Sequence, residues 1–155
     1  MFLKKIISGG QTGVDRAALD AAIKLRIPHG GWCPAGRIAE DGIIPENYQL
    51  NETNSSLYKE RTRMNICDAD FTLILMQNGR WGSGTLFTKN TCIRLQKPFF
   101  VEDLLNPDIK SIKKSLTVIC ENPVLNCAGN RESTSPGIYL NSLNYLCDLF
   151  RELRQ

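Results

Sequence analysis

The sequence predicts an α/β fold: a single Rossmann-like three-layer domain in which a mostly parallel five-stranded sheet carries helices on both faces. Two observations predict it. Short apolar runs alternate with segments of helical periodicity, which is the order of strand–helix–strand units in a parallel sheet. The chain also has 155 residues, the size of one domain, and no repeat or linker divides residues 1–155.

The N-terminal third supplies two of the expected strands. Residues 2–8 form an apolar run that ends at paired glycines, as a strand followed by a turn does. Apolar residues then recur at helical spacing over residues 14–25, which predicts a helix with one apolar face. Residues 31–33 predict a short second strand, and residues 34–54 a polar segment interrupted by glycine and proline.

The middle of the chain contains its most apolar run. A helix that Asn54 or Ser55 can cap extends to Cys67. Residues 71–76 are apolar nearly throughout, which indicates a central strand covered on both faces. A glycine-rich turn then leads into a helix over residues 85–95.

The C-terminal third continues the alternation. Residues 98–101 and 124–129 predict two further strands, with a short helix over residues 109–116 between them. Along residues 139–153 the apolar positions step alternately by four and three, which predicts an amphipathic helix.

Composition excludes several classes of protein. The net charge is +3, from 19 basic and 16 acidic residues, which is too mild for a general nucleic-acid-binding protein. No apolar stretch reaches the roughly 18 residues of a transmembrane helix, so we expect no membrane partner. The apolar residues before Gly9 are too few for a secretory signal peptide, and we expect a cytoplasmic protein.

The six cysteines favour neither a zinc site nor a disulfide framework. No C-x-x-C pair occurs and His29 is the sole histidine, so we expect no metal site and reduced thiols, with His29 structural. Cys92, Cys127 and Cys147 lie on elements expected to pack inside the domain. Cys33 is the one thiol expected beside a ligand loop.

In a doubly wound sheet, ligands bind beyond the carboxyl ends of the strands, so the loops there are the places to look for chemistry. The first loop follows the first strand and opens a helix. Its glycine amides and the helix N-terminus favour an anion. It matches neither the dinucleotide fingerprint nor a Walker A loop. Its candidate ligand-binding residues are Gly9, Gly10, Gln11, Thr12, Gly13 and Asp15.

The second loop contributes Gly36, Arg37, Glu40, Asp41 and Gly42. Arg37 can pair bidentately with a phosphate, while Glu40 and Asp41 can bind sugar hydroxyls or a cation. A surface loop with an internal ion pair explains the same residues equally well.

The third loop opens the helix that follows the central strand. Like the first loop, it offers glycine amides and a helix N-terminus, which favour an anion. Two such helix N-termini at the ends of neighbouring strands predict a cleft for a phosphate-bearing ligand. Its candidate residues are Gly82, Ser83, Gly84, Thr85 and Thr88. On the preceding helix, Arg61 and Asn65 share a face, and we expect at least one of Arg61 and Arg63 at the surface.

The last loop follows the fifth strand and contributes Gly129, Arg131, Glu132 and Ser133. Arg131 is a second candidate phosphate partner. The same segment can also begin the last helix, with Ser133 or Ser135 as its cap and Pro136 in its first turn.

The sequence contains no recognisable set of catalytic residues. No motif places a nucleophilic cysteine beside a base, and a serine triad would depend wholly on the single histidine. The carboxylates on the ligand loops belong to Asp15, Glu40, Asp41 and Glu132; any of them can serve as a general base, and none is singled out. We therefore assign no catalytic residue.

Taken together, the loops resemble the family named "putative molybdenum carrier" (molybdenum cofactor carrier protein). The resemblance is carried by residues 8–20, 31–34, 36–37, 40–42, 61–62, 65, 82–88, 131–133 and 136–139. It implies a homo-oligomer, a dimer or tetramer, that binds the molybdenum cofactor, a pterin dithiolene carrying a phosphate, or a related nucleotide-like molecule. Molybdoenzymes would be the recipients. The family pattern leads us to expect a basic residue at position 35 and proline at 130, where this chain has Ala35 and Asn130.

The same superfamily contains the lysine-decarboxylase-like phosphoribohydrolases. Their glycine loop resembles residues 82–85, but a catalytic glutamate follows it where this chain has Phe87 and Thr88. We therefore favour a binding or carrier protein without turnover. The alternatives are an enzyme that acts on the N-glycosidic bond of a nucleotide with a loop carboxylate, and an adaptor domain with no ligand.

Overall fold

A computed structural model describes residues 3–155, and part of the expected first strand, at Phe2, lies outside them. Five strands form one sheet in the order β2-β1-β9-β7-β8, and all four pairings are parallel. The strands are β1 (Lys5–Ile7), β2 (His29–Gly30), β7 (Phe71–Met76), β8 (Phe99–Asp103) and β9 (Val124–Gly129). The predicted α/β fold with a five-stranded parallel sheet is confirmed.

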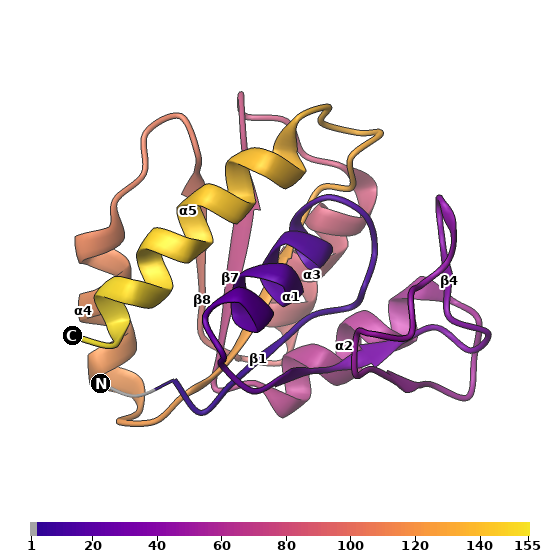
Figure 1. Ribbon diagram of the computed structural model, residues 1–155, viewed down its shortest axis with the longest axis horizontal. Coiled ribbons are helices and arrows are strands. Elements are labelled where there is room, and N and C mark those ends of the chain that lie inside the picture. Colours follow the sequence, from indigo (N-terminus) through magenta and orange to yellow (C-terminus); the bar gives the residue numbers. More distant parts are fainter. Residues whose placement is uncertain (1–2) are drawn as a thin grey trace.

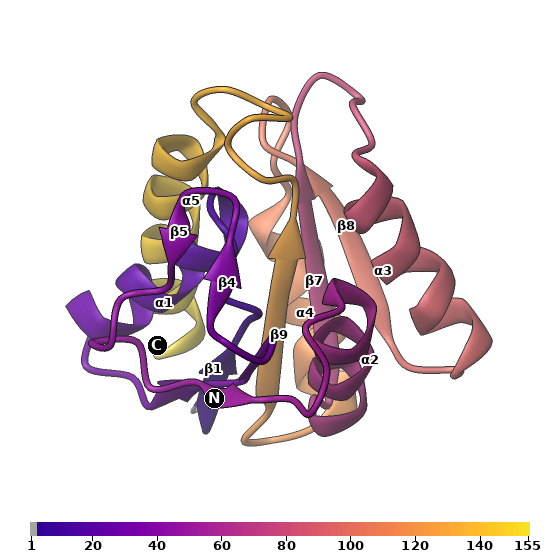
Figure 2. The ribbon, with the colours of Figure 1, turned by 90° about the vertical axis from the view of Figure 1, so that its right-hand side faces the viewer.

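Five helices complete the three layers. Helices α1 and α4 both pack against α5 on one face, and α2 and α3 lie on the other, so the sheet is covered on both sides (Figures 1 and 2). None of the helices within residues 3–155 is both long and apolar enough to cross a bilayer. The helices are α1 (Val14–Lys24), α2 (Tyr58–Asp68), α3 (Ser83–Arg94), α4 (Ile109–Ile119) and α5 (Ile138–Leu153).

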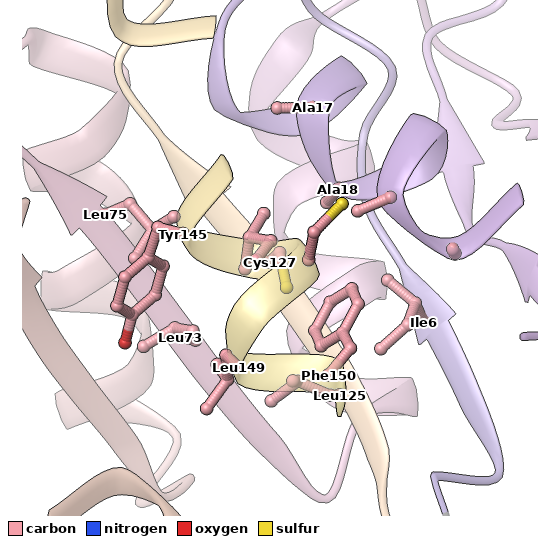
Figure 3. Close-up of a cluster of buried hydrophobic side chains, with 14 of the residues drawn as sticks. Ile6, Ala17, Ala18, Leu73, Leu75, Leu125, Cys127, Tyr145, Leu149 and Phe150 are labelled. Carbon is pink, nitrogen blue, oxygen red and sulfur yellow. The ribbon is translucent and has the colours of Figure 1, made fainter. Parts of the chain in front are cut away.

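The main core lies between α1, α5 and the sheet. Side chains of Leu149 and Phe150 on α5 face Ile6, Leu73 and Leu125 from three neighbouring strands (Figure 3). These side chains are almost completely buried. This packing holds the carboxyl ends of β1, β9 and β7 side by side, which is what the site requires.

The second strand of the sheet lies two residues earlier than predicted. His29 and Gly30 pair with β1, whereas β3 (Trp32–Cys33) pairs with β6 (Asn51–Glu52) in a separate small sheet. The chain leaves the main sheet at Gly31, whose φ is +122° and where a Cβ would come within 2.4 Å of the Ser8 carbonyl oxygen. Only glycine fits such an approach.

The polar segment after β3 is more ordered than the sequence predicts. It contains an antiparallel hairpin, β4 (Ile38–Ala39) and β5 (Gly42–Ile43), labelled in Figure 2. Ile44, Tyr48 and Leu50 of the segment form a second small core with Leu19 of α1 and Cys33 of β3.

The cap of α2 also differs from the prediction. Leu57 occupies the N-cap position without a side-chain cap. Ser55 lies two residues before it, and the Ser55 hydroxyl accepts the backbone N–H of Leu57.

Candidate functional site

A cavity of about 460 Å³ lies beyond the carboxyl ends of β1, β9 and β7. Its remaining walls are the N-terminal turns of α2 and α3 and the first turn of α1. This is the position at which parallel α/β sheets bind ligands. The residues used below to describe it are Gly9, Gln11, Asp15, Tyr58, Arg61, Gly82, Ser83, Gly84, Thr85, Phe87, Thr88, Gly129 and Arg131.

The N-terminus of α3 is open toward the cavity. Gly82 is its N-cap, and the first intrahelical bond is donated by Leu86 to the Gly82 carbonyl. The amides of Ser83, Gly84 and Thr85 therefore have no intrahelical acceptor, and all three residues line the cavity. Such an array of N–H groups at the positive end of a helix dipole favours an anion.

Asn130 holds this helix terminus in place. Its Oδ1 accepts the Gly82 amide at 3.0 Å and the Thr85 hydroxyl at 2.5 Å. Its Nδ2 donates to the Arg80 carbonyl at 2.7 Å and to the Ser135 hydroxyl at 2.9 Å. Because the side chain is 2% exposed and uses both of its polar atoms, it fixes the loop before α3 from the end of β9.

The N-terminus of α1 differs from that of α3. The Val14 amide donates to the Asn130 carbonyl at 3.3 Å, and the Arg16 amide to the Gln11 carbonyl at 3.2 Å. Gly13 permits this contact, since a Cβ there would lie 2.4 Å from the Asn130 oxygen. The two predicted anion-binding helix termini are therefore not equivalent, because protein carbonyls already accept two of the amides at the start of α1.

A buried aspartate and a buried arginine lie at the β1 end of the cavity. Arg61 Nη1 is 3.8 Å from Asp15 Oδ2 and donates to the Gly9 carbonyl at 2.6 Å. Burial raises the pKa of Asp15, and the charge of Arg61 and the Gln11 amide oppose that rise only partly. A buried acid with a raised pKa, in a cavity beside a charged partner, is a candidate functional group.

Gln11 adds an unsatisfied donor to the same wall. Its Oε1 accepts the backbone amides of Thr12 and Glu40, at 3.0 and 2.9 Å, which identifies the other side-chain atom as the nitrogen. That Nε2 is buried and has no hydrogen-bond partner among the described residues. Unsatisfied buried donors are rare in folded proteins.

Aromatic rings and cations form the outer wall. Two guanidinium groups lie over the Tyr58 ring, with Arg61 5.3 Å and Arg131 5.4 Å from its centroid. The Phe87 ring is 5.4 Å from the Lys59 ammonium. The cavity therefore combines flat apolar surfaces with positive charge, which suits a planar ring carrying an anionic group.

Comparison with known proteins identifies the family of this chain. A model of the circularly permutated YpsA SLOG family matches residues 6–150. The chain belongs to this family. It is also 44% identical to a protein of Syntrophus aciditrophicus SB whose crystal structure is described as a "putative molybdenum carrier protein"; the similarity covers 96% of this chain and 94% of that one, with a TM-score of 0.85. No curated protein matches significantly.

Within this SLOG-family chain, six of the residues predicted from the sequence line a second, shallower depression. They are Thr12, Gly13, Glu40, Asp41, Glu132 and Ser133. Glu40 accepts hydrogen bonds from the Thr12 hydroxyl and from the amide and hydroxyl of Ser133, and its Oε2 is 3.7 Å from Arg131 Nη1. Asp41 is paired with Arg16. These carboxylates fasten the β4–β5 hairpin to the rim of the site.

Arg37 does not line either hollow, contrary to the expectation that it meets a phosphate. Its guanidinium donates to the carbonyls of Ile44, Pro45, Tyr48 and Leu50, and so it organises its own loop.

Three predicted glycines are also placed away from the cavity. Gly36 donates its amide to Glu52, Gly42 belongs to the hairpin, and Gly10 packs against Ile44 and Leu50.

The start of α5 is capped by Glu132 rather than by Ser133 or Ser135. The Glu132 carboxylate accepts the amides of Gly137 and Tyr139, at 2.5 and 2.9 Å. Pro136 precedes the helix instead of lying in its first turn.

The thiol that lines the main cavity is that of Cys127, whereas the sequence predicts Cys33 beside a ligand loop. Cys127 lies on β9 and lines the cavity, whereas Cys33 is buried in the small core under the second loop. Burial, together with the nearby charge of Asp15, raises the pKa of the Cys127 thiol. Among the described residues all six cysteines are free.

Sequence reasoning missed the walls contributed by α2 and β9. Tyr58, Lys59 and Asn126 line the cavity without belonging to any loop motif. Helical spacing indicates that Arg61 and Asn65 share a face, and both side chains are buried. Arg63 is exposed, as expected for at least one of the two arginines.

Proposed function

We propose that this protein binds a phosphate-bearing, nucleotide-like cofactor without turnover, and that this cofactor is the molybdenum cofactor. The observation that carries the proposal is the open N-terminus of α3, at Ser83, Gly84 and Thr85, in a cavity that also contains Arg61 and Arg131. The name of the 44% identical protein supports the same conclusion.

The residues present fit such a ligand. The α3 amides and Arg131 would hold the phosphate, and Tyr58 and Phe87 would cover the planar pterin. Among residues 3–155, no group of three or more histidine, cysteine or acidic side chains could hold a metal ion. Molybdenum would therefore be held by the dithiolene of the cofactor, which supplies redox chemistry to a recipient enzyme.

The remaining expectations belong to the same proposal. A carrier of this kind would act in the cytoplasm as a homo-oligomer and deliver its cofactor to molybdoenzymes. Nucleic acid and membranes are not proposed as partners, since the charge is mild and the cavity is small enough for one cofactor.

The alternative, cleavage of an N-glycosidic bond, has less support. Asp15 is the one carboxylate among the described residues that line the main cavity. Glu40, Asp41 and Glu132 line the other depression and are engaged with partners. An acid–base pair across a glycosidic bond needs two positioned groups.

Gly84 offers a selective test. It lines the cavity, and a Cβ placed on it would meet no atom within 4 Å. The variant Gly84→Val should fold normally but obstruct the anion site, and Thr117→Val on the exposed side of α4 is the control.

The experiment is a mass spectrum and metal analysis of the protein as isolated, followed by calorimetric titration with the molybdenum cofactor and with nucleoside monophosphates. We expect binding by the wild type and the control, and a loss of at least about tenfold in Gly84→Val. Retention of none of these ligands, or equal binding by Gly84→Val, would refute the proposal.

A further inference from the structure

We propose that the inner end of the cavity recognises the hydrogen-bonding edge of a 2-amino-4-oxopyrimidine ring, the edge that guanine and pterins share, through Asp15, Gln11 and Arg61. The inference rests on the proposed function and deepens it, because it names the part of the ligand that lies opposite the phosphate.

Asp15 is the acceptor in this group. It is 7% exposed and lines the cavity, and its Oδ2 accepts one backbone amide, that of Gln11, at 3.2 Å. A carboxylate offers about four lone-pair sites, so it has room for donors from a ligand. The ring N–H and the exocyclic amino group of a 2-amino-4-oxopyrimidine are adjacent donors that match its two oxygens.

Gln11 and Arg61 are the donors. Gln11 is 4% exposed, lines the same cavity and carries the unpartnered Nε2. Arg61 donates through Nε to Thr62 and through Nη1 to Gly9, and a guanidinium has five N–H groups. The ring carbonyl beside the N–H would accept from these donors, which relieves the unsatisfied amide.

The span of the cavity favours the ring edge over a ribose diol. Asp15 and Gln11 follow β1, α3 follows β7, and β9 lies between those strands, so the two ends are separated by two strand spacings, about 10 Å. A ribose diol lies only a few bonds from its 5′-phosphate. The far edge of the ring lies at the opposite end of the ligand from the phosphate, so its distance from the phosphate is much greater. Tyr58 and Phe87 lie along the way, where the flat ring would pass.

Adenine is the informative comparison. On the corresponding edge it presents one amino group and a ring nitrogen with a lone pair, so it would place an acceptor toward the Asp15 carboxylate. A site built around buried polar groups discriminates strongly against a ligand that leaves them unpaired.

The test is calorimetric titration near neutral pH with GMP, AMP, ribose 5-phosphate and dihydroneopterin monophosphate. We expect GMP or the pterin phosphate to bind at least about tenfold more tightly than AMP. Asp15→Asn keeps the shape of the side chain but should abolish this preference while changing the affinity for ribose 5-phosphate less than about twofold. Asp148→Asn, on the exposed side of α5, should change nothing.

Each outcome decides. Preference for GMP alone or for the pterin alone supports the shared edge and identifies its source. Equal binding of AMP, or a preference that survives in Asp15→Asn, overturns the inference but leaves the proposed function standing if Gly84→Val still abolishes binding. If none of the four phosphates binds, the inference fails, and the proposed function is then decided by the titration with the molybdenum cofactor itself. Should Asp15→Asn not fold, as judged by circular dichroism, Gln11→Leu replaces it with the same expected loss of preference.

Discussion

The side-chain oxygen of Asn130 accepts the hydroxyl of Thr85 at 2.5 Å, which joins the end of β9 to the first turn of α3. The same amide group also bonds Gly82, Arg80 and Ser135. The anion site therefore does not depend on the glycine-rich turn alone. Its shape is imposed by a residue 45 positions away in the sequence.

Replacement of Asn130 should accordingly impair both folding and binding. Asn130→Ala would leave the Arg80 carbonyl and the Gly82 amide without their partner, and we expect a loss of about 1–3 kcal/mol in the free energy of unfolding. Affinity for ribose 5-phosphate should fall as well, since the α3 terminus is released. Urea denaturation and calorimetry measure the two effects. Asn144→Ala, at an exposed position of α5, is the control, and an equal response of both variants would contradict this role.

Asp15 should make the protein less stable as pH rises. Because burial raises its pKa in the folded state, the folded protein binds more protons than the unfolded chain between the unfolded and folded pKa values. Stability is then greatest below the ordinary aspartate pKa and declines as pH rises through the folded value. Asp15→Asn should remove this decline and be more stable than the wild type at neutral pH. Urea titrations at acidic and neutral pH test the sign, and a variant less stable at neutral pH would show that the Arg61 pair outweighs burial.

Glu40 should respond in the opposite direction. Its partial burial acts to raise the pKa, but hydrogen bonds from Ser133 and Thr12 outweigh that effect and hold the pKa below its usual value. The contact between the hairpin and the rim is therefore complete above the ordinary glutamate pKa and is lost as pH falls through the lowered one. The backbone amide of Ser133, followed by NMR, should titrate with a midpoint below 4.5. Glu40→Gln should abolish this titration; a midpoint at or above the ordinary value would exclude the contact.

The cysteines should differ in reactivity according to burial. Cys67 is exposed, whereas Cys127 lies under the cavity with its pKa raised by burial. The thiolate is the reactive form, so iodoacetamide at mildly alkaline pH should modify Cys67 first and leave Cys127 intact, as peptide mass spectrometry would show. Cys67→Ser should remove the fast phase. Modification of Cys127 at the rate of Cys67 would mean that the cavity opens in solution.

The sequence predicts the sheet well because its strongest signals are local. Strand β7 occupies the predicted residues 71–76, because a run that is apolar nearly throughout is typical of a strand covered on both faces. The second strand was placed two residues late because nothing in the residue types at Gly31 shows that the Ser8 carbonyl lies against it.

The site is less predictable because its chemistry depends on distant contacts. Arg37 and Arg131 look equivalent in the sequence, yet one bonds four carbonyls of its own loop and the other lines the cavity. The burial of Arg61 follows from the Gly9 carbonyl 52 positions away. Helical spacing shows which residues share a face, but it does not show what lies opposite that face.

The cap of α5 is another contact that the sequence does not reveal, and it can be tested. Glu132 accepts the amides of Gly137 and Tyr139, so Glu132→Ala should cost about 1 kcal/mol in the free energy of unfolding, as the loss of an N-terminal cap does. Glu132→Gln keeps one acceptor oxygen and should lose less than Glu132→Ala, because one of the two amides keeps its acceptor, while the other hydrogen bond and the interaction of the charge with the helix dipole are lost. Glu46→Ala, at an exposed position of the second loop, supplies the baseline for removing an acidic side chain. If Glu132→Ala were no less stable than Glu46→Ala, capping by Glu132 would contribute nothing, and the role would return to Ser133 or Ser135.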